Sequence, residues 1–434
     1  MNAAVISNRS AVAVWVLAAA AFGLVMAAAF GRGGEAAWAE GLIMLAGACG
    51  ITTASLSLPA LPKPFLLAIS LWAAFVLWTL VQSLPLPALA NPFWGELRAD
   101  FPEVGAGSIA LDPYAVRMDA LRLSAYAGMV ALGLTLGGRG WAKIVLLACG
   151  LMVAAFAAAG IAMQAAEWPD AVPKVRHAAD ATFPFSNRNT YCVFAGIAVI
   201  LAAAALAFGR NRAFRPTGRM TLVGILAVAG AGVVASHSRA GLAAVFAGTV
   251  VAVMLASPPR RLLVFALAGA GLVTLASLAG LTGARAQHLP EDLAIRLSVW
   301  ESSAVVALQH LWLGLGNLDQ ALTMHPGDWG ERHILRAHNI YLQTIAERGL
   351  PATLAAVAAI ALVVLECVRN LRGPNRFAVA AALGVTVMFG LHGLVDFSLY
   401  SPLNAALLAL LLGIAGALPP PSGSFTKPQL TNSQ

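Results

Sequence analysis

The sequence has few charged residues. Of its 434 residues, 11% are Asp, Glu, Lys or Arg, whereas 59% are hydrophobic. Soluble domains have about a quarter of their residues charged, so this composition excludes an ordinary soluble core. Apolar stretches of about 20 residues recur along the whole length, and each is long enough to cross a bilayer. We therefore predict an all-α, polytopic integral membrane protein.

Cysteine is also scarce. The sequence has four cysteines, which lie far apart and within apolar runs: Cys49, Cys149, Cys192 and Cys367. This spacing predicts neither a disulfide framework nor a metal cluster. We interpret these residues as small buried hydrophobic side chains.

Nucleotide-binding motifs are missing as well. The sequence contains no G-x-x-x-x-G-K-[ST] phosphate loop, no strand–G-x-G-x-x-G–helix unit, and no acidic pair for a metal-bound nucleotide. The net charge is +8, but short basic loops between the apolar runs account for most of it. Because no basic-aromatic module accompanies them, we expect no nucleic-acid partner, and we expect no cofactor or metal.

About twelve transmembrane spans are expected. They fall at residues 11–30, 37–56, 65–82, 118–137, 144–163, 190–208, 220–236, 240–257, 262–281, 340–366, 377–394 and 402–418. We interpret the first as a retained helix rather than a cleaved signal peptide. The loops GRNRAFRPTGR, PPRR and RNLRGPNR are strongly basic, and basic loops face the cytoplasm. Both termini are then cytoplasmic, and all acidic residues except Glu366 lie on the outer side.

We expect one transmembrane domain over residues 1–418, followed by a disordered cytoplasmic tail at 419–434. Periplasmic insertions are expected at about 83–116, 164–189 and 282–338, the last of them helical and directly before the tenth span. No ATP or nucleotide sugar is available on that side of a bacterial membrane. A group-transfer enzyme there needs a substrate that is already activated. A glycan on a polyprenyl diphosphate meets this need, because the lipid partitions into the bilayer and the diphosphate is a good leaving group.

Arginines on the outer side are candidates for binding the two phosphates. The guanidinium fork binds phosphate oxygens bidentately and keeps its charge. Arg188 lies in FPFSNRNTY, Arg239 in SHSRAG, Arg296 in RLSVW and Arg336 just before the tenth span. For Arg188, Arg296 and Arg336, snorkelling or a surface ion pair is the alternative. Arg239 lies in a very short turn at the bilayer, where charges are functional candidates by default.

The most polar stretch is RAHNIYLQTIAERG, residues 336–349. Asn339, Gln343 and Glu347 recur every four residues and form one polar stripe on a helix. His338 precedes this stripe at the N-terminal end of the helix, where free N–H groups and the helix dipole favour an anion. An imidazole has an ordinary pKa of about 6.5 and can act as a general base. A helix cap and interface anchor, with His338 merely hydrogen-bonded, is the alternative.

The same stretch resembles the signature of the O-antigen ligase and polymerase superfamily. In this signature, His and a following Asn, Ser or Gln precede a Gly by a fixed spacing, which His338, Asn339 and Gly349 reproduce. The family often has a second Gly three positions later, where this chain has Ala352. Other segments are similar to the family in the same order: FPFSNRNTYCVFAG, SHSRAGLAA and RLSVWESSAVVALQHLWLGLGNLDQA, with DPYAVRMDALRL and HGLVDFSLYSP matching more loosely.

This resemblance implies a bacterial inner-membrane glycosyltransferase of the C type. Such enzymes move a glycan from undecaprenyl diphosphate at the periplasmic face without a metal. The resemblance makes His338 the candidate base and makes Arg239, Arg188 and Arg296 candidate diphosphate contacts. Asn339 and Arg239 are grouped with His338 as catalytic candidates, and Asn187, Arg336 and Gln343 are grouped with Arg188 and Arg296 as substrate-binding ones.

The acceptor remains open at this point. A ligase would use a hydroxyl of lipid A–core or a related acceptor, whereas a polymerase would extend the glycan on its lipid carrier, and the motifs are common to both. The short chain and the His–Asn spacing favour the ligase. A transporter of lipid-linked glycan is the alternative from another class. The polar residues are concentrated at one face and charges in mid-bilayer are scarce, which argues against it.

Overall fold

The computed structural model describes residues 3–57, 61, 63–166, 180–208, 215–256, 289–319, 336–373 and 375–417. All regular structure in these ranges is helical, which confirms the predicted all-α class. The longer helices are α1 (Ala3–Ala29), α2 (Ala37–Ser57), α3 (Lys63–Gln82), α5 (Pro113–Gly138), α6 (Ala142–Ala165), α7 (Arg188–Ala207), α8 (Pro216–Ala235), α9 (Arg239–Ala256), α11 (Leu289–Gln309), α14 (Leu350–Arg369), α15 (Arg376–His392) and α16 (Pro402–Gly416). The shorter ones are η1 (Pro87–Leu89), α4 (Phe93–Asp100), α13 (Ile340–Arg348), η5 (Asn370–Arg372) and η6 (Ser398–Tyr400).

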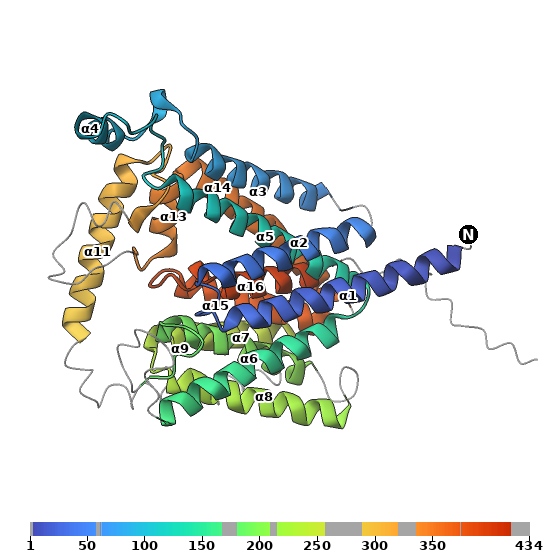
Figure 1. The fold of residues 1–434 in the computed structure, drawn as a ribbon. Helices are drawn as coiled ribbons and strands as arrows, with labels where there is room; N and C mark the ends of the chain where they lie inside the picture. The colour runs from blue at the N-terminus through green and yellow to red at the C-terminus, as the bar shows by residue number, and fades with distance from the viewer. Residues whose placement is uncertain are drawn as a thin grey trace, which may run out of the picture.

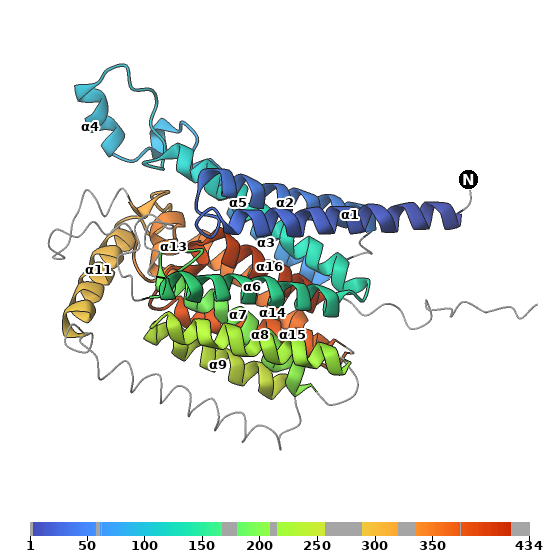
Figure 2. The same ribbon diagram turned by 60° about the horizontal axis from the view of Figure 1, so that its bottom comes forward.

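The helices form a bundle suited to a membrane. Most of them lie along one common direction, with α4, α11 and α13 gathered at one end and the N-terminus at the other (Figure 1). Figure 2 shows the same arrangement from a second side, with α11 running across the end of the bundle. Within the described residues, nine helices are long and apolar enough to cross a membrane, and α15 and α16 are shorter apolar helices. The chain is therefore a multi-pass membrane protein.

Two of the predicted segments lie outside the described residues. These are the span at 262–281 and the cytoplasmic tail at 419–434. The third insertion is described in part, and its helix α11 agrees with the predicted helical character. The four cysteines are free, and three of them are buried, as expected for small residues in apolar runs.

Glycines allow the bundle to pack closely. Gly47 and Gly50 of α2 face Ala125 and Gly128 of α5, and a Cβ at Gly47 would lie 2.5 Å from the Ala125 Cα. Small residues at such crossings let two helix backbones approach, which is the usual packing mode between helices in membranes. α7 lies at the centre of the bundle, since 89% of its apolar window is buried. The residues at the start of α7 are therefore held by a rigid core.

The stretch predicted as one span at 340–366 is two helices, so the prediction of a continuous helix was wrong. α13 ends at Arg348, α14 begins at Leu350, and Gly349 between them has φ 78° and ψ 160°. This backbone region is essentially restricted to glycine. α13 is polar and buries Gln343 and Glu347 inside the protein, whereas α14 is apolar enough to cross a membrane. The turn at Gly349 separates this polar helix from α14.

The Gly349→Ala variant is expected to lose about 1–3 kcal/mol of unfolding free energy from the backbone conformation alone. An added Cβ would also lie 2.5 Å from the carbonyl oxygen of Trp312. The midpoint of thermal unfolding of the purified protein in detergent measures this loss. Gly230→Ala is the matched control, because the Cβ position at Gly230 of α8 is open and alanine favours a helix. A midpoint for Gly349→Ala equal to that of the control would contradict the assigned turn.

Candidate functional site

Polar side chains from four turns meet at the end of the bundle where α11 and α13 lie. We call this region the polar end. The turns comprise residues 180–189 before α7, 236–239 between α8 and α9, 336–339 before α13, and 393–401 between α15 and α16. The charge pattern of the loops predicts that this end faces the periplasm.

Asp396 connects three of these turns. Its carboxylate is fully buried. Oδ2 accepts a hydrogen bond from Asn189 Nδ2 at 2.6 Å, and Oδ1 accepts from the Phe397 N–H at 2.7 Å and from Ser398 Oγ at 3.3 Å. Asn189 Oδ1 in turn accepts from Ser238 Oγ at 2.8 Å. The start of α7, the start of α9 and the loop after α15 are thus fixed to one another.

Asp180 is a second buried carboxylate, and it lies beside the arginine candidates. Its side chain is 1% exposed, Oδ2 is 3.1 Å from Arg188 Nη1, and Oδ1 is 2.9 Å from His237 Nδ1. Arg239, two residues after His237, is the exposed first residue of α9. Arg188 and Arg239 therefore begin neighbouring helices, and Asn189 and Ser238 link the two starts by a hydrogen bond.

His338 lies directly before α13 in a left-handed backbone conformation, with φ 50°. Its ring meets the ring of Phe397 edge-on at 5.0 Å between centroids. Its carbonyl accepts a hydrogen bond from Trp300 Nε1 of α11 at 3.3 Å. Arg296, one turn earlier on α11, donates to the carbonyl of Val395. These contacts place α11 against both His338 and the Asp396 loop.

The surroundings of His338 favour its neutral form. Burial lowers the pKa of the imidazole and the charge of Arg296 acts in the same direction, while the charge of Asp396 opposes them. Nδ1 is buried and has no hydrogen-bond partner among the described residues. An imidazole that is neutral at neutral pH can accept a proton from a substrate hydroxyl. Strained backbone at such a position is typical of functional sites.

Asn339 and Gln343 hold the start of α13. Asn339 is its N-cap, since Oδ1 accepts from the backbone N–H groups of Tyr341 and Leu342 at 3.0 and 3.1 Å. Gln343 is fully buried. Its Oε1 accepts from the Ala337 N–H at 3.3 Å, and its Nε2 donates to Glu347 Oε1 at 3.0 Å. The two side chains thus fix the backbone on both sides of His338.

Arg336 lies two residues before His338 but has its own partners. Its guanidinium stands 4.7 Å over the ring of Tyr400, and its Nε is 3.6 Å from Asp319 Oδ1. Burial raises the pKa of Asp319 to about 6, against the opposing charge of Arg336. A guanidinium held over an aromatic ring in this way is a cation–π contact.

A buried ionic network lies beneath Arg336. The Tyr400 hydroxyl donates to Glu347, and Arg348 pairs with Asp119. Arg348 Nη1 also donates to Gln82 Oε1 at 3.2 Å and to the Gly316 carbonyl at 2.7 Å. Asp119 pairs further with Arg122, which lies 3.2 Å from Glu40. This network joins α2, α3, α5 and α13, and so anchors the helix that follows His338.

The structure separates the predicted residues by role. Arg296 lies near His338. Arg188 and Arg239 lie at the linked starts of α7 and α9. Asn187 is the N-cap of α7, where its Oδ1 accepts from the Asn189 N–H at 2.7 Å. Sequence reasoning missed the bridging role of Asn189 and the carboxylate of Asp180. The SNRN sequence indicated that asparagines lie here. Only the position of the first turn of α7 shows that Asn187 caps the helix and that Asn189 reaches Asp396.

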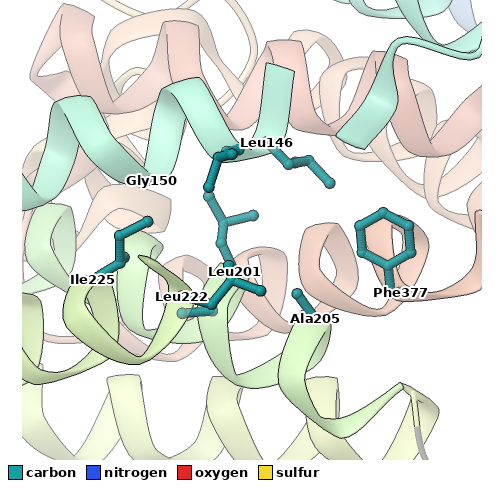
Figure 3. Close-up of a pocket in the computed structure, with 9 residues that line it drawn as sticks. Leu146, Gly150, Leu201, Ala205, Leu222, Ile225 and Phe377 are labelled. Carbon is teal, nitrogen blue, oxygen red and sulfur yellow. The ribbon is translucent and has the colours of Figure 1, made fainter. Parts of the chain in front are cut away.

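An apolar pocket lies elsewhere in the bundle, between α6, α7, α8 and α15 (Figure 3). Side chains such as Leu201, Leu222, Ile225 and Phe377 line it. They come from the C-terminal half of α7, the first half of α8 and the start of α15. Arg188 lies at the other end of α7. Its lining offers no charged side chain to hold a charged substrate, whereas the polar end offers several.

The fold and the polar end together define a multi-pass membrane protein with a site at one end of its helices. Residues 222–357 match the family model described as O-antigen ligase. This match confirms the resemblance to the O-antigen ligase and polymerase superfamily. The matched segment includes Arg239, Arg296, Arg336 and His338, whereas Arg188 and Asp396 lie outside it. A comparison with curated proteins gives no match.

The Arg348→Met variant is expected to lose about 3–5 kcal/mol of unfolding free energy, because it leaves buried carboxylates without their cation. Arg348 is 4% exposed and has Gln82, Gly316 and Asp119 as partners. Denaturant titration in detergent measures the loss. The control is Arg117→Met, since Arg117 of α5 is exposed and exposed charges contribute about 0–1 kcal/mol. Similar losses in both variants would contradict a stabilising role for the network.

Proposed function

We propose that the protein is an O-antigen ligase-like glycosyltransferase, which moves a glycan from undecaprenyl diphosphate to an acceptor hydroxyl at the periplasmic face. The observation that carries this proposal is the environment of His338. Its ring is buried with Nδ1 unpartnered among the described residues, and Arg296 lies on the adjoining helix. The surrounding segment matches the O-antigen ligase family model. Membrane helices support the use of a lipid-borne donor.

Three arginines are proposed to bind the diphosphate. Arg188 and Arg239 begin adjacent helices. Arg296 lies on α11 and donates to the Val395 carbonyl, next to Asp396. Guanidinium groups bind phosphate oxygens bidentately. Preorganised cations stabilise the charge that develops on a leaving group in the transition state, which is the task that a metal performs in other transferases. The proposed mechanism therefore requires no metal.

His338 is proposed to act as the general base. It takes the proton of the acceptor hydroxyl, and the oxygen forms a bond to the anomeric carbon. The bond from that carbon to the diphosphate breaks, and its electron pair leaves with the diphosphate. The charge of Asp396 favours the imidazolium that results. Asn339 and Gln343 are proposed to position His338 through the backbone, and Arg336 to contact the glycan or the acceptor.

The His338→Ala variant is expected to lower kcat by about 10²–10⁴-fold, the usual contribution of a general base. In the unmodified protein, kcat should fall as the pH drops through the lowered pKa of His338, because only the neutral imidazole accepts a proton. Transfer from undecaprenyl-diphosphate-linked glycan by purified protein in detergent measures both effects. His310→Ala, directly after α11, serves as the control. Full activity of His338→Ala would remove this residue from the mechanism.

The acceptor can be identified in cells that lack the gene. We expect lipopolysaccharide without attached glycan on an envelope gel, because a ligase performs the attachment step. A single attached repeat would instead indicate a polymerase. Unchanged lipopolysaccharide with loss of a secreted polymer would indicate an exopolysaccharide enzyme. If purified wild-type protein forms no new glycosidic bond in micelles, the transferase proposal fails and transport of the lipid-linked glycan takes its place.

A further inference from the structure

His237 and Asp180 form a second histidine–carboxylate pair at the polar end. His237 Nδ1 lies 2.9 Å from Asp180 Oδ1, and the carboxylate is 1% exposed. The side chain of His237 is 49% exposed. A buried carboxylate that accepts from Nδ1 fixes the orientation of the ring and its tautomer. Nε2 is then the ring nitrogen that is left to contact a ligand.

The backbone at His237 is held in an uncommon conformation. Its φ is 51°, in the left-handed region that His338 also adopts. The left-handed region brings the Cβ of a side chain close to the following carbonyl oxygen. Non-glycine residues retain such a conformation where the surrounding structure holds it, and functional sites are enriched in it. The turn preceding α9 is held in place by Ser236, whose Oγ accepts from the Ser238 N–H at 3.2 Å.

The charges around His237 suit an anionic ligand. Asp180 lies before α7, Arg188 begins α7, and Arg239 begins α9. Arg188 Nη1 lies 3.1 Å from the same carboxylate that holds His237. Arg239 is an exposed cation at the start of the neighbouring helix, two residues after His237.

We propose that His237, oriented by Asp180, is a further donor-binding residue that contacts the lipid-linked diphosphate together with Arg188 and Arg239. In its protonated form, Nε2–H donates to a phosphate oxygen while Nδ1–H donates to Asp180. The neutral tautomer fixed by Asp180 has Nε2 as an acceptor and cannot make the phosphate contact. This assignment rests on the proposed function, because that proposal supplies the diphosphate. It gives the two histidines opposite tasks: His338 is active when neutral and His237 when charged.

Binding of undecaprenyl diphosphate to the full-length protein in nanodiscs tests the assignment without an acceptor. His237→Gln should weaken binding by about tenfold, the loss expected for one charge-assisted hydrogen bond. His237→Arg keeps a permanent cation and should restore most of the affinity.

The binding results show whether the role of His237 fails alone or together with the proposed function. His310→Gln, a half-buried histidine at the end of α11, is the matched control and should bind like the wild type. Equal thermal midpoints for the wild type and His237→Gln show that the variant is folded. If the wild type binds undecaprenyl diphosphate and His237→Gln binds equally well, the role of His237 is wrong while the proposed function stands. If the wild type does not bind undecaprenyl diphosphate at all, both proposals fall.

Discussion

The hydrogen bonds of the Asp396 carboxylate hold the polar end together. Asp396 is fully buried, and a buried carboxylate is tolerated only with good partners. Its partners come from the start of α7 and from its own loop, and Asn189 extends the connection to Ser238 before α9. Arg296 binds the carbonyl next to Asp396, which brings α11 to the same place. The Asp396 loop therefore links the starts of α7 and α9 with α11.

The polar end contains two ionic systems of different kinds. On one side, the network of Glu347, Arg348 and Asp119 is buried and internally paired, so it anchors α13. On the other side, Arg188 and His237 share a buried carboxylate but keep partly exposed side chains. The first system anchors the helix that follows the proposed base, and the second leaves cationic groups accessible. A transferase that uses a charged lipid donor requires both properties, a rigid base and an open cationic surface.

The sequence allowed the helical class and most helix positions to be predicted, because long apolar runs have few alternatives in a bilayer. It did not reveal the break at Gly349, because glycine also occurs within helices and only the backbone angles show the turn. The residue types at the candidate site were predictable from their chemistry. Their roles were not: Asn187 and Asn189 differ only in their place relative to the first turn of α7. Gln343, expected to contact substrate, is fully buried between Ala337 and Glu347, which only the tertiary structure shows.

The central claim is that a lipid-borne diphosphate binds at the polar end between the arginines and His338. An experimental structure of the protein in nanodiscs with undecaprenyl diphosphate tests it most directly. The account predicts that the diphosphate lies against Arg188, Arg239 and Arg296, with the lipid tail leading into the bilayer and His338 on the side of the terminal phosphate, which carries the glycan in the donor. A diphosphate bound at the other end of the helices, or one that leaves these arginines without contact, would contradict the account.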